Sequence, residues 1–203
     1  MINAKQHFEQ NIIRVKSLGA IYQSINSQTI QILDLSDILR AQYVMLVSAL
    51  DHFIHEVVRI GMIEIYNNKR KATKNFKVFV FNLDKEILFK KAIMEEKNDN
   101  WLDYQIRYKN GFKSFQEADK IKEAMFLIIE TDIWEDIDKN IINSKQYLNL
   151  IVKRRNQIAH EADIEPINQE LRDIHLDDIK NSIEFIEDLV KIIYKVVSKK
   201  YDK

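Results

Sequence analysis

The stretch SDILRAQYVMLVSALDHFIHEVVRIGMIEIY, residues 36–66, decides the fold class. Its large apolar side chains recur at steps of four and three residues, a spacing that places them on one face of an α-helix. The stripe consists of Leu46, Leu50, Phe53, Val57 and Ile60, and it is widened by Val47, Ile54 and Val58. This pattern predicts one long amphipathic helix over the whole stretch.

Helical spacing also recurs along most of the remaining chain. It predicts further helices over residues 4–25, 82–97, 117–130, 140–163 and 176–197. The chain has only three glycines and one proline, which favours long helices over an all-β fold rich in turns. We therefore expect an all-α bundle of about six helices, folded as one domain over residues 1–203.

Three segments do not fit the helical pattern. Residues 67–77, NNKRKATKNFK, hold five basic side chains and predict a polar loop. The only strand-like alternation is FKVFVF at 76–81, which is too isolated for a sheet and is interpreted as a connector or a short edge. Residues 98–116 are irregular and predict a loop with partial helix.

Charge and composition exclude several classes of protein. There are 31 basic and 31 acidic residues, and this balance disfavours a protein that coats long nucleic acid by bulk electrostatics. It leaves room for an enzyme that meets one phosphate in one pocket. Disulfides and thiolate metal sites are excluded because the chain has no cysteine. The polar start MINAKQHFEQ and the lack of a long apolar run predict a cytoplasmic protein without a signal peptide or membrane helix.

The stretch RRNQIAHEAD, residues 154–163, interrupts an apolar stripe with a cation. The stripe of the predicted helix runs Leu148, Ile151, Arg155, Ile158, Ala162. A guanidinium keeps its proton, so partial burial at Arg155 is costly unless an anionic group meets it. His160 lies five residues further on, about 140° around an ideal helix. Asn156 and His160 are four residues apart and share a face.

These side chains suit cleavage of RNA without a metal ion. Histidine can shuttle protons while a ribose 2′-OH attacks the adjacent phosphate. Arginine can hold the crowded phosphorane through two parallel hydrogen bonds. Arg155, His160 and Asn156 are the candidate catalytic residues, and Lys153 and Arg154 are candidate RNA contacts. The alternative is a solvated basic cluster with a histidine that interacts favourably with the helix dipole.

The sequence resembles the RiboL-PSP branch of the HEPN superfamily of ribonucleases. RRNQIAH has the shape of the superfamily signature, and three stretches follow the branch in order: LDHFIHEVVR at 50–59, FKSFQEADKI at 112–121, and RRNQIAHEAD leading to IHLDDIKNSIEFIEDLV. The likeness covers residues from about 40 to the C-terminus. It implies a helical bundle that dimerises, with one cleft built from the arginine and histidine of both chains. It also implies metal-independent endoribonuclease activity, often in a toxin or a phage-defence effector.

A second constellation, DHFIHE at 51–56, is open to three interpretations. His52, His55 and Glu56 have a spacing that could hold a metal ion on one helical face, but no third strong ligand lies nearby and we expect no metal or other cofactor. The same side chains can also form stabilising pairs four residues apart, Asp51–His55 and His52–Glu56. The resemblance favours a third interpretation, in which Asp51 or Glu56 meets Arg155 across the bundle, with His55 beside them.

Two other groups of residues bear on RNA binding. Trp101, Tyr104, Tyr108 and Phe112 are interleaved with basic residues and could stack RNA bases, although we favour an interpretation in which they close the edge of the core. The basic loop at 69–77 is the better candidate for RNA contact, with a solvated charge run as its alternative.

The leading hypothesis is a homodimeric, metal-independent endoribonuclease that acts on RNA. The main alternative is a catalytically silent HEPN module that binds an antitoxin or a sensor protein. A metal-dependent hydrolase is the third. Intact Arg155, Asn156 and His160 favour the enzyme.

Overall fold

The computed structural model describes residues 1–28, 33–79 and 100–199. The helices of these residues are α1 (Ile2–Asn26), α2 (Ser36–Tyr66), α3 (Lys74–Lys77), α5 (Asn100–Asn110), α6 (Ala118–Met125), α7 (Ile133–Asp138), α8 (Ser144–His160) and α9 (Leu176–Ser198). The fold is all-α, as predicted, and the predicted helices beginning at residues 4, 36 and 176 are confirmed. The helix expected over 82–97 lies outside the described residues.

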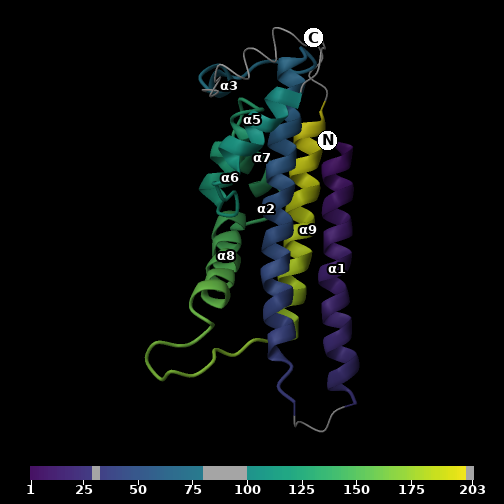
Figure 1. Cartoon of the computed structure of the whole chain (residues 1–203), viewed down its shortest axis with the longest axis vertical. Helices are drawn as coiled ribbons and strands as arrows, with labels where there is room; N and C mark the ends of the chain where they lie inside the picture. The colour runs from purple at the N-terminus through teal and green to yellow at the C-terminus, as the bar shows by residue number, and fades with distance from the viewer. Residues whose placement is uncertain (29–32, 80–99, 200–203) are drawn as a thin grey trace.

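The three longest helices form the centre of the molecule. α1, α2 and α9 lie side by side, with α1 antiparallel to the other two, and α5 to α8 cover a flank of α2 (Figure 1). The apolar stripe of α2 explains this arrangement, since its widened face is buried on several sides. Leu46, Leu50, Phe53 and Val57 are completely buried. Ile60, the last residue of the predicted stripe, is only half-buried.

α9 completes the core, because it also buries an apolar stripe at helical spacing. Its isoleucines and valines return at helical spacing and pack against α1, α2 and α7. The buried members of this stripe are Ile179, Ile183, Ile186, Val190, Ile193 and Val197. Two aspartates, Asp177 and Asp178, lie in the first turn, where negative charge stabilises the exposed N–H groups of a helix.

Both segments predicted as loops contain a helix, α3 in residues 67–77 and α5 in residues 98–116, and α7 lies where no element was predicted. Residues 100–110 form α5. The sequence pattern there is irregular because few of the side chains are buried; over residues 101–110 these are Leu102, Gln105, Ile106 and Asn110. Asp132 caps the N-terminus of α7, where its carboxylate accepts a hydrogen bond from the Trp134 amide at 3.0 Å. The Trp134 indole is buried and donates to the carbonyl of Ala118 at 2.9 Å, which anchors this short helix on α6.

Other predicted boundaries were too long. α6 ends at Met125 and not at residue 130. α8 ends at His160 and not at residue 163, because Ala162 and Asp163 both take a positive φ, which a helix does not accommodate. Within the FKVFVF segment, Phe76 and Lys77 end α3; the remaining described residues, Val78 and Phe79, form no strand.

None of the helices formed by the described residues is long and apolar enough to cross a membrane.

Candidate active site on helix α8

The fully buried residues of α8 all lie in its first half, while Ile158 in the second half packs against the core and is only partly buried. Ser144, Leu148, Ile151 and Val152 are its buried residues, and they face α2, α6 and α7. From residue 153 to its end, every side chain of α8 is half-buried or exposed. The signature residues lie in this second half, at the end of the molecule where α2 and α9 begin (Figure 1).

Arg155 is half-buried, in line with the interrupted stripe. Its Nη1 donates to Oδ1 of Asn156 at 3.1 Å. Its Nε is buried and has no hydrogen-bond partner among the described residues. A buried donor without an acceptor is costly, so this guanidinium is suited to an anionic partner that comes from outside the chain.

Asn156 lines a groove of about 400 Å³ on the surface of α8. The polar side chains around this groove belong to Glu117, Asn149, Lys153, Asn156, Gln157 and Glu161. Asn149 also holds the groove together, since its Oδ1 accepts a hydrogen bond from the Ala118 amide at the start of α6. Lys153 is exposed here and is available to a phosphate.

His160 is the last residue of α8 and is exposed. It follows Asn156 by one helical turn, so both project on the same side of the helix end. Within the described part of the chain, no hydrogen bond joins His160 to Arg155 or to any other residue. The imidazole is therefore open to a ligand that approaches from solvent.

Arg154 does not line this groove, and its contact with RNA stays a prediction. Its guanidinium binds both carboxylate oxygens of Asp163, through Nη1 to Oδ1 and through Nη2 to Oδ2, the latter at 2.9 Å. The same carboxylate accepts a hydrogen bond from Nε of Arg40 at 2.7 Å, and Arg172 lies 3.9 Å away. Asp163 was missed in the sequence, where it reads as one more acid in a polar exit from the helix.

Glu56 does not meet Arg155 either, so that prediction is wrong within one chain. Its carboxylate accepts hydrogen bonds from Arg59 and from Arg107, which in turn bind Asp103. Burial raises the pKa of Glu56, but the hydrogen bonds and positive charges of Arg59 and Arg107 outweigh burial and leave this pKa below its usual value. Glu56 therefore belongs to an ion network between α2 and α5.

Asp51 and His55 support a different loop, not Arg155. Oδ1 of Asp51 accepts a hydrogen bond from the Phe115 amide at 2.6 Å. The His55 ring lies 4.4 Å from the Phe115 ring, and its Nε2 is 3.2 Å from the carbonyl of Lys113. These contacts fix the segment between α5 and α6.

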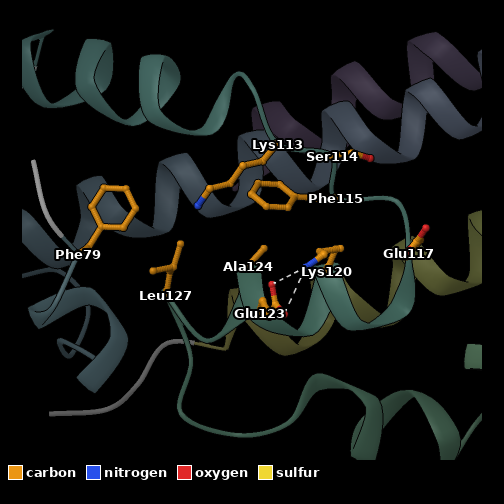
Figure 2. A pocket seen from close by; sticks show the side chains of 9 residues that line it. All are labelled: Phe79, Lys113, Ser114, Phe115, Glu117, Lys120, Glu123, Ala124 and Leu127. Atoms are coloured by element: carbon orange, nitrogen blue, oxygen red, sulfur yellow. Dashed lines mark hydrogen bonds and ion pairs between the residues drawn. The ribbon is translucent and has the colours of Figure 1, made fainter.

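Phe115 forms one wall of a second hollow, of about 460 Å³. In Figure 2 the apolar side chains of Phe79, Phe115 and Leu127 surround the hollow, and Lys113 reaches across it. Glu117 lines both hollows, so the second one borders the α8 groove.

Three of the four aromatic residues of this segment do not close the core, which corrects the interpretation we favoured. Tyr104, Tyr108 and Phe112 are all exposed, Phe112 to 86%. They form a row along one face, with Tyr104 and Tyr108 stacked at 6.2 Å between ring centroids and Phe112 edge-on to Tyr108 at 5.9 Å. Only Trp101 packs against the core.

The lysines of the basic segment 69–77 are exposed, so RNA contact there stays a prediction. Arg70 turns inward and binds Glu64 at 2.9 Å and the carbonyl of Val197 at 2.7 Å. Lys69, Lys71, Lys74 and Lys77 are exposed. No cluster of three histidine or acidic side chains with the arrangement of a metal site occurs in residues 1–28, 33–79 and 100–199.

Comparison with known proteins places this arrangement in a class. The all-α bundle, with a match that covers nearly the whole chain, makes this a protein of the HEPN superfamily. Within the superfamily the chain belongs to the RiboL-PSP-HEPN family, whose model it matches over residues 9–199. Membership indicates a nuclease or an RNA-related function. No curated protein and no solved structure matches the chain.

Proposed function

We propose that this protein is a metal-independent endoribonuclease whose active site is built on the second half of α8. The observation that carries the proposal is the guanidinium of Arg155. It is half-buried, its Nε has no acceptor within the described chain, and its Nη1 contacts Asn156, which lines the groove. A phosphate diester supplies the anionic oxygens that this cation lacks.

The chemistry assigns one role to each residue. The imidazole of His160 takes the proton of a ribose 2′-OH, whose oxygen then bonds to the adjacent phosphorus. Arg155 stabilises the phosphorane through charged hydrogen bonds, and Asn156 orients the guanidinium that it already contacts. The 5′-oxygen leaves with a proton from an imidazolium. The products are a 2′,3′-cyclic phosphate and a 5′-hydroxyl end, and no metal ion takes part.

We propose further that two copies form the working enzyme. α8 has an exposed apolar residue on its outer face, Leu150, and the segments on either side of the helix carry Ile142, Ile167 and Leu171, all exposed. Exposed apolar side chains that gather in one patch mark protein interfaces, and we propose that these four contribute to one. Contact between two α8 helices brings a second Arg155 and a second His160 to one cleft. Arg155 of one copy can then act with His160 of the other, although the two are not hydrogen-bonded within one chain.

The test is cleavage of RNA by purified protein in EDTA, followed by analysis of the product ends. We expect 2′,3′-cyclic phosphates from the wild type and no cleavage by Arg155→Ala or His160→Ala. Arg14→Ala and His175→Ala serve as controls, because both side chains are exposed and lie outside α8, Arg14 on α1 and His175 directly before α9. Full cleavage by both signature variants, or a requirement for metal, contradicts the proposal.

Mixing the two inactive variants tests the shared cleft. A heterodimer of Arg155→Ala and His160→Ala has one arginine and one histidine at the same interface, so partial recovery of cleavage is expected. Leu150→Asp places a charge at the proposed contact and is expected to yield monomers in light scattering with loss of activity. A fully active monomer contradicts the dimer proposal.

The setting that we propose is a cytoplasmic toxin or phage-defence effector, controlled by an antitoxin or a sensor protein. A silent HEPN module that only binds such a partner is the second candidate. The exposed row of Tyr104, Tyr108 and Phe112 favours it, since aromatic side chains of this kind are enriched at protein interfaces. Absence of RNA cleavage by the wild type, together with partner binding that Tyr108→Ala abolishes, decides for this candidate.

A further inference from the structure

Asp163 is a carboxylate without any solvent exposure, three residues beyond the end of the signature motif. Its backbone has a φ of 58°, and its amide donates to the carbonyl of Gln157 at 3.0 Å, which turns the chain sharply at the end of α8. A buried carboxylate is stable only when cations and hydrogen bonds replace its water. Arg40, Arg154 and Arg172 provide these contacts.

The ion pair between Arg154 and Asp163 joins two residues that stand on either side of the proposed active-site residues in the sequence. Arg154 stands directly before Arg155, and Asp163 stands three residues after His160. The two-point contact between their side chains therefore closes a ring of chain that contains Arg155, Asn156 and His160. Within that ring, the last turn of α8 cannot unwind without separating a buried ion pair.

The other two arginines fix this ring to the body of the protein. Arg40 lies in the first turns of α2, and besides Asp163 it binds Oγ of Ser36 and, through Nη2 at 2.8 Å, the carbonyl of Arg172. The Arg172 amide donates to the carbonyl of Asp163 at 2.9 Å. The end of α8 thus has a buried anchor on α2, although none of its own side chains from residue 153 onward is fully buried.

We propose that Asp163 is the positioning residue for His160. By holding Arg154 on one side and Arg40 on the other, it keeps the last turn of α8 helical and sets the direction in which the His160 imidazole projects. Asp163 touches no substrate. The proposal rests on the proposed function for its effect on catalysis, while its structural part concerns the orientation of one imidazole.

Two variants test the role. Asp163→Asn keeps the shape of the side chain and removes its charge, and Arg154→Gln leaves Asp163 paired with Arg40 and Arg172, so the second variant remains informative if the first fails to fold. Asp173→Asn is the matched control, because its carboxylate is exposed and lies in the same segment. All are studied as full chains well below their unfolding temperatures.

We expect kcat for RNA cleavage to fall about a hundredfold in both variants, as for a catalytic group displaced by roughly 1 Å, with KM within about twofold of the wild type. In NMR spectra the His160 ring resonances, assigned by their loss in His160→Ala, shift or broaden. The other four histidines serve as internal controls, since the chain has five. Asp173→Asn matches the wild type in both measurements.

The outcomes separate the two proposals. If the wild type cleaves RNA, Arg155→Ala does not, and both folded cluster variants keep the wild-type kcat, the positioning role is overturned and the nuclease remains. If the wild type cleaves no RNA, the proposed function fails. The NMR result then decides the positioning role alone, and an unchanged His160 signal in both variants overturns it.

Discussion

Replacement of Glu56 by glutamine is expected to lower stability and to leave catalysis intact. The Glu56 side chain is 9% exposed and accepts hydrogen bonds from Nε and Nη2 of Arg59 and from Nη1 of Arg107, at 2.8 to 3.1 Å. Glutamine keeps the volume but turns an amide toward these donors. Arg59 then keeps only Asp103 as an anionic partner.

The size of the effect follows from burial. Breaking a fully buried ion pair costs about 3–5 kcal/mol, whereas exposed pairs contribute about 0–1 kcal/mol. Arg59 is mostly buried, while Arg107 is about half exposed and contributes little. We therefore expect a loss of about 2–3 kcal/mol. For a chain of this length that loss corresponds to a Tm lower by about 5–10 °C.

The contribution of Glu56 to the free energy of unfolding should depend on pH. The pKa of Glu56 is lowered in the folded protein, so its contribution to stability is complete above its unfolded pKa and is lost as pH falls through the lowered folded value. Thermal unfolding followed by far-UV circular dichroism should show the full gap between wild type and Glu56→Gln at about pH 7 and a gap that narrows as the pH falls below about 4.

A matched control separates this network from ordinary surface charge. Glu123→Gln breaks the exposed pair with Lys120 and is expected to change Tm by less than about 2 °C. RNA cleavage by Glu56→Gln, measured well below its Tm, should equal that of the wild type, because the structure separates this carboxylate from Arg155. An unchanged Tm, or a gap that persists undiminished in acid, refutes the reasoning.

Three further predictions concern other parts of the molecule. Arg155→Lys keeps the charge but loses the two-point contact with phosphate, so single-turnover cleavage should slow about 10²–10³-fold, and an unchanged rate contradicts the role. Gly61→Ala brings a Cβ to 2.6 Å from Cγ2 of Ile128 and should cost about 1–3 kcal/mol in urea unfolding, where a midpoint equal to the wild type's counts against the packing. Asp132→Ala removes the cap of α7 and the pair with Lys122, for a loss of about 1–2 kcal/mol at neutral pH. Burial raises the pKa of Asp132, but Lys122 and the Trp134 amide outweigh it and lower the pKa, so the loss should diminish in acid.

The long helices were predictable because their signal is local and repeated. α2 begins and ends at the predicted residues, since its stripe of large apolar side chains alone fixes a buried face over many turns. α5 and α7 are short and expose many of their residues, so their pattern is weak. α7 depends on a distant contact, the hydrogen bond from Trp134 to Ala118, which no periodicity reveals.

The candidate site was predictable in part for the same reason. Arg155, Asn156 and His160 lie on one helix, so their relative placement follows from spacing. The partners of Glu56 and Arg154 lie far along the chain or beyond a turn, and sequence spacing does not indicate which acid meets which arginine. The end of α8 was misplaced because Ala162 and Asp163 take a positive φ without a glycine to mark it.

The fully buried residues of α8 end at Val152, and the proposed active site follows them. Packing of the fold and recognition of a ligand therefore depend on different residues of the same helix. Its first half supplies apolar contacts to the bundle, so changes there cost folding free energy. Beyond Val152, the side chains at the groove contribute little packing, so under the proposed function Lys153 or Gln157 can be replaced to suit another RNA at little cost to stability. Such a helix can change its target while the scaffold behind it stays the same.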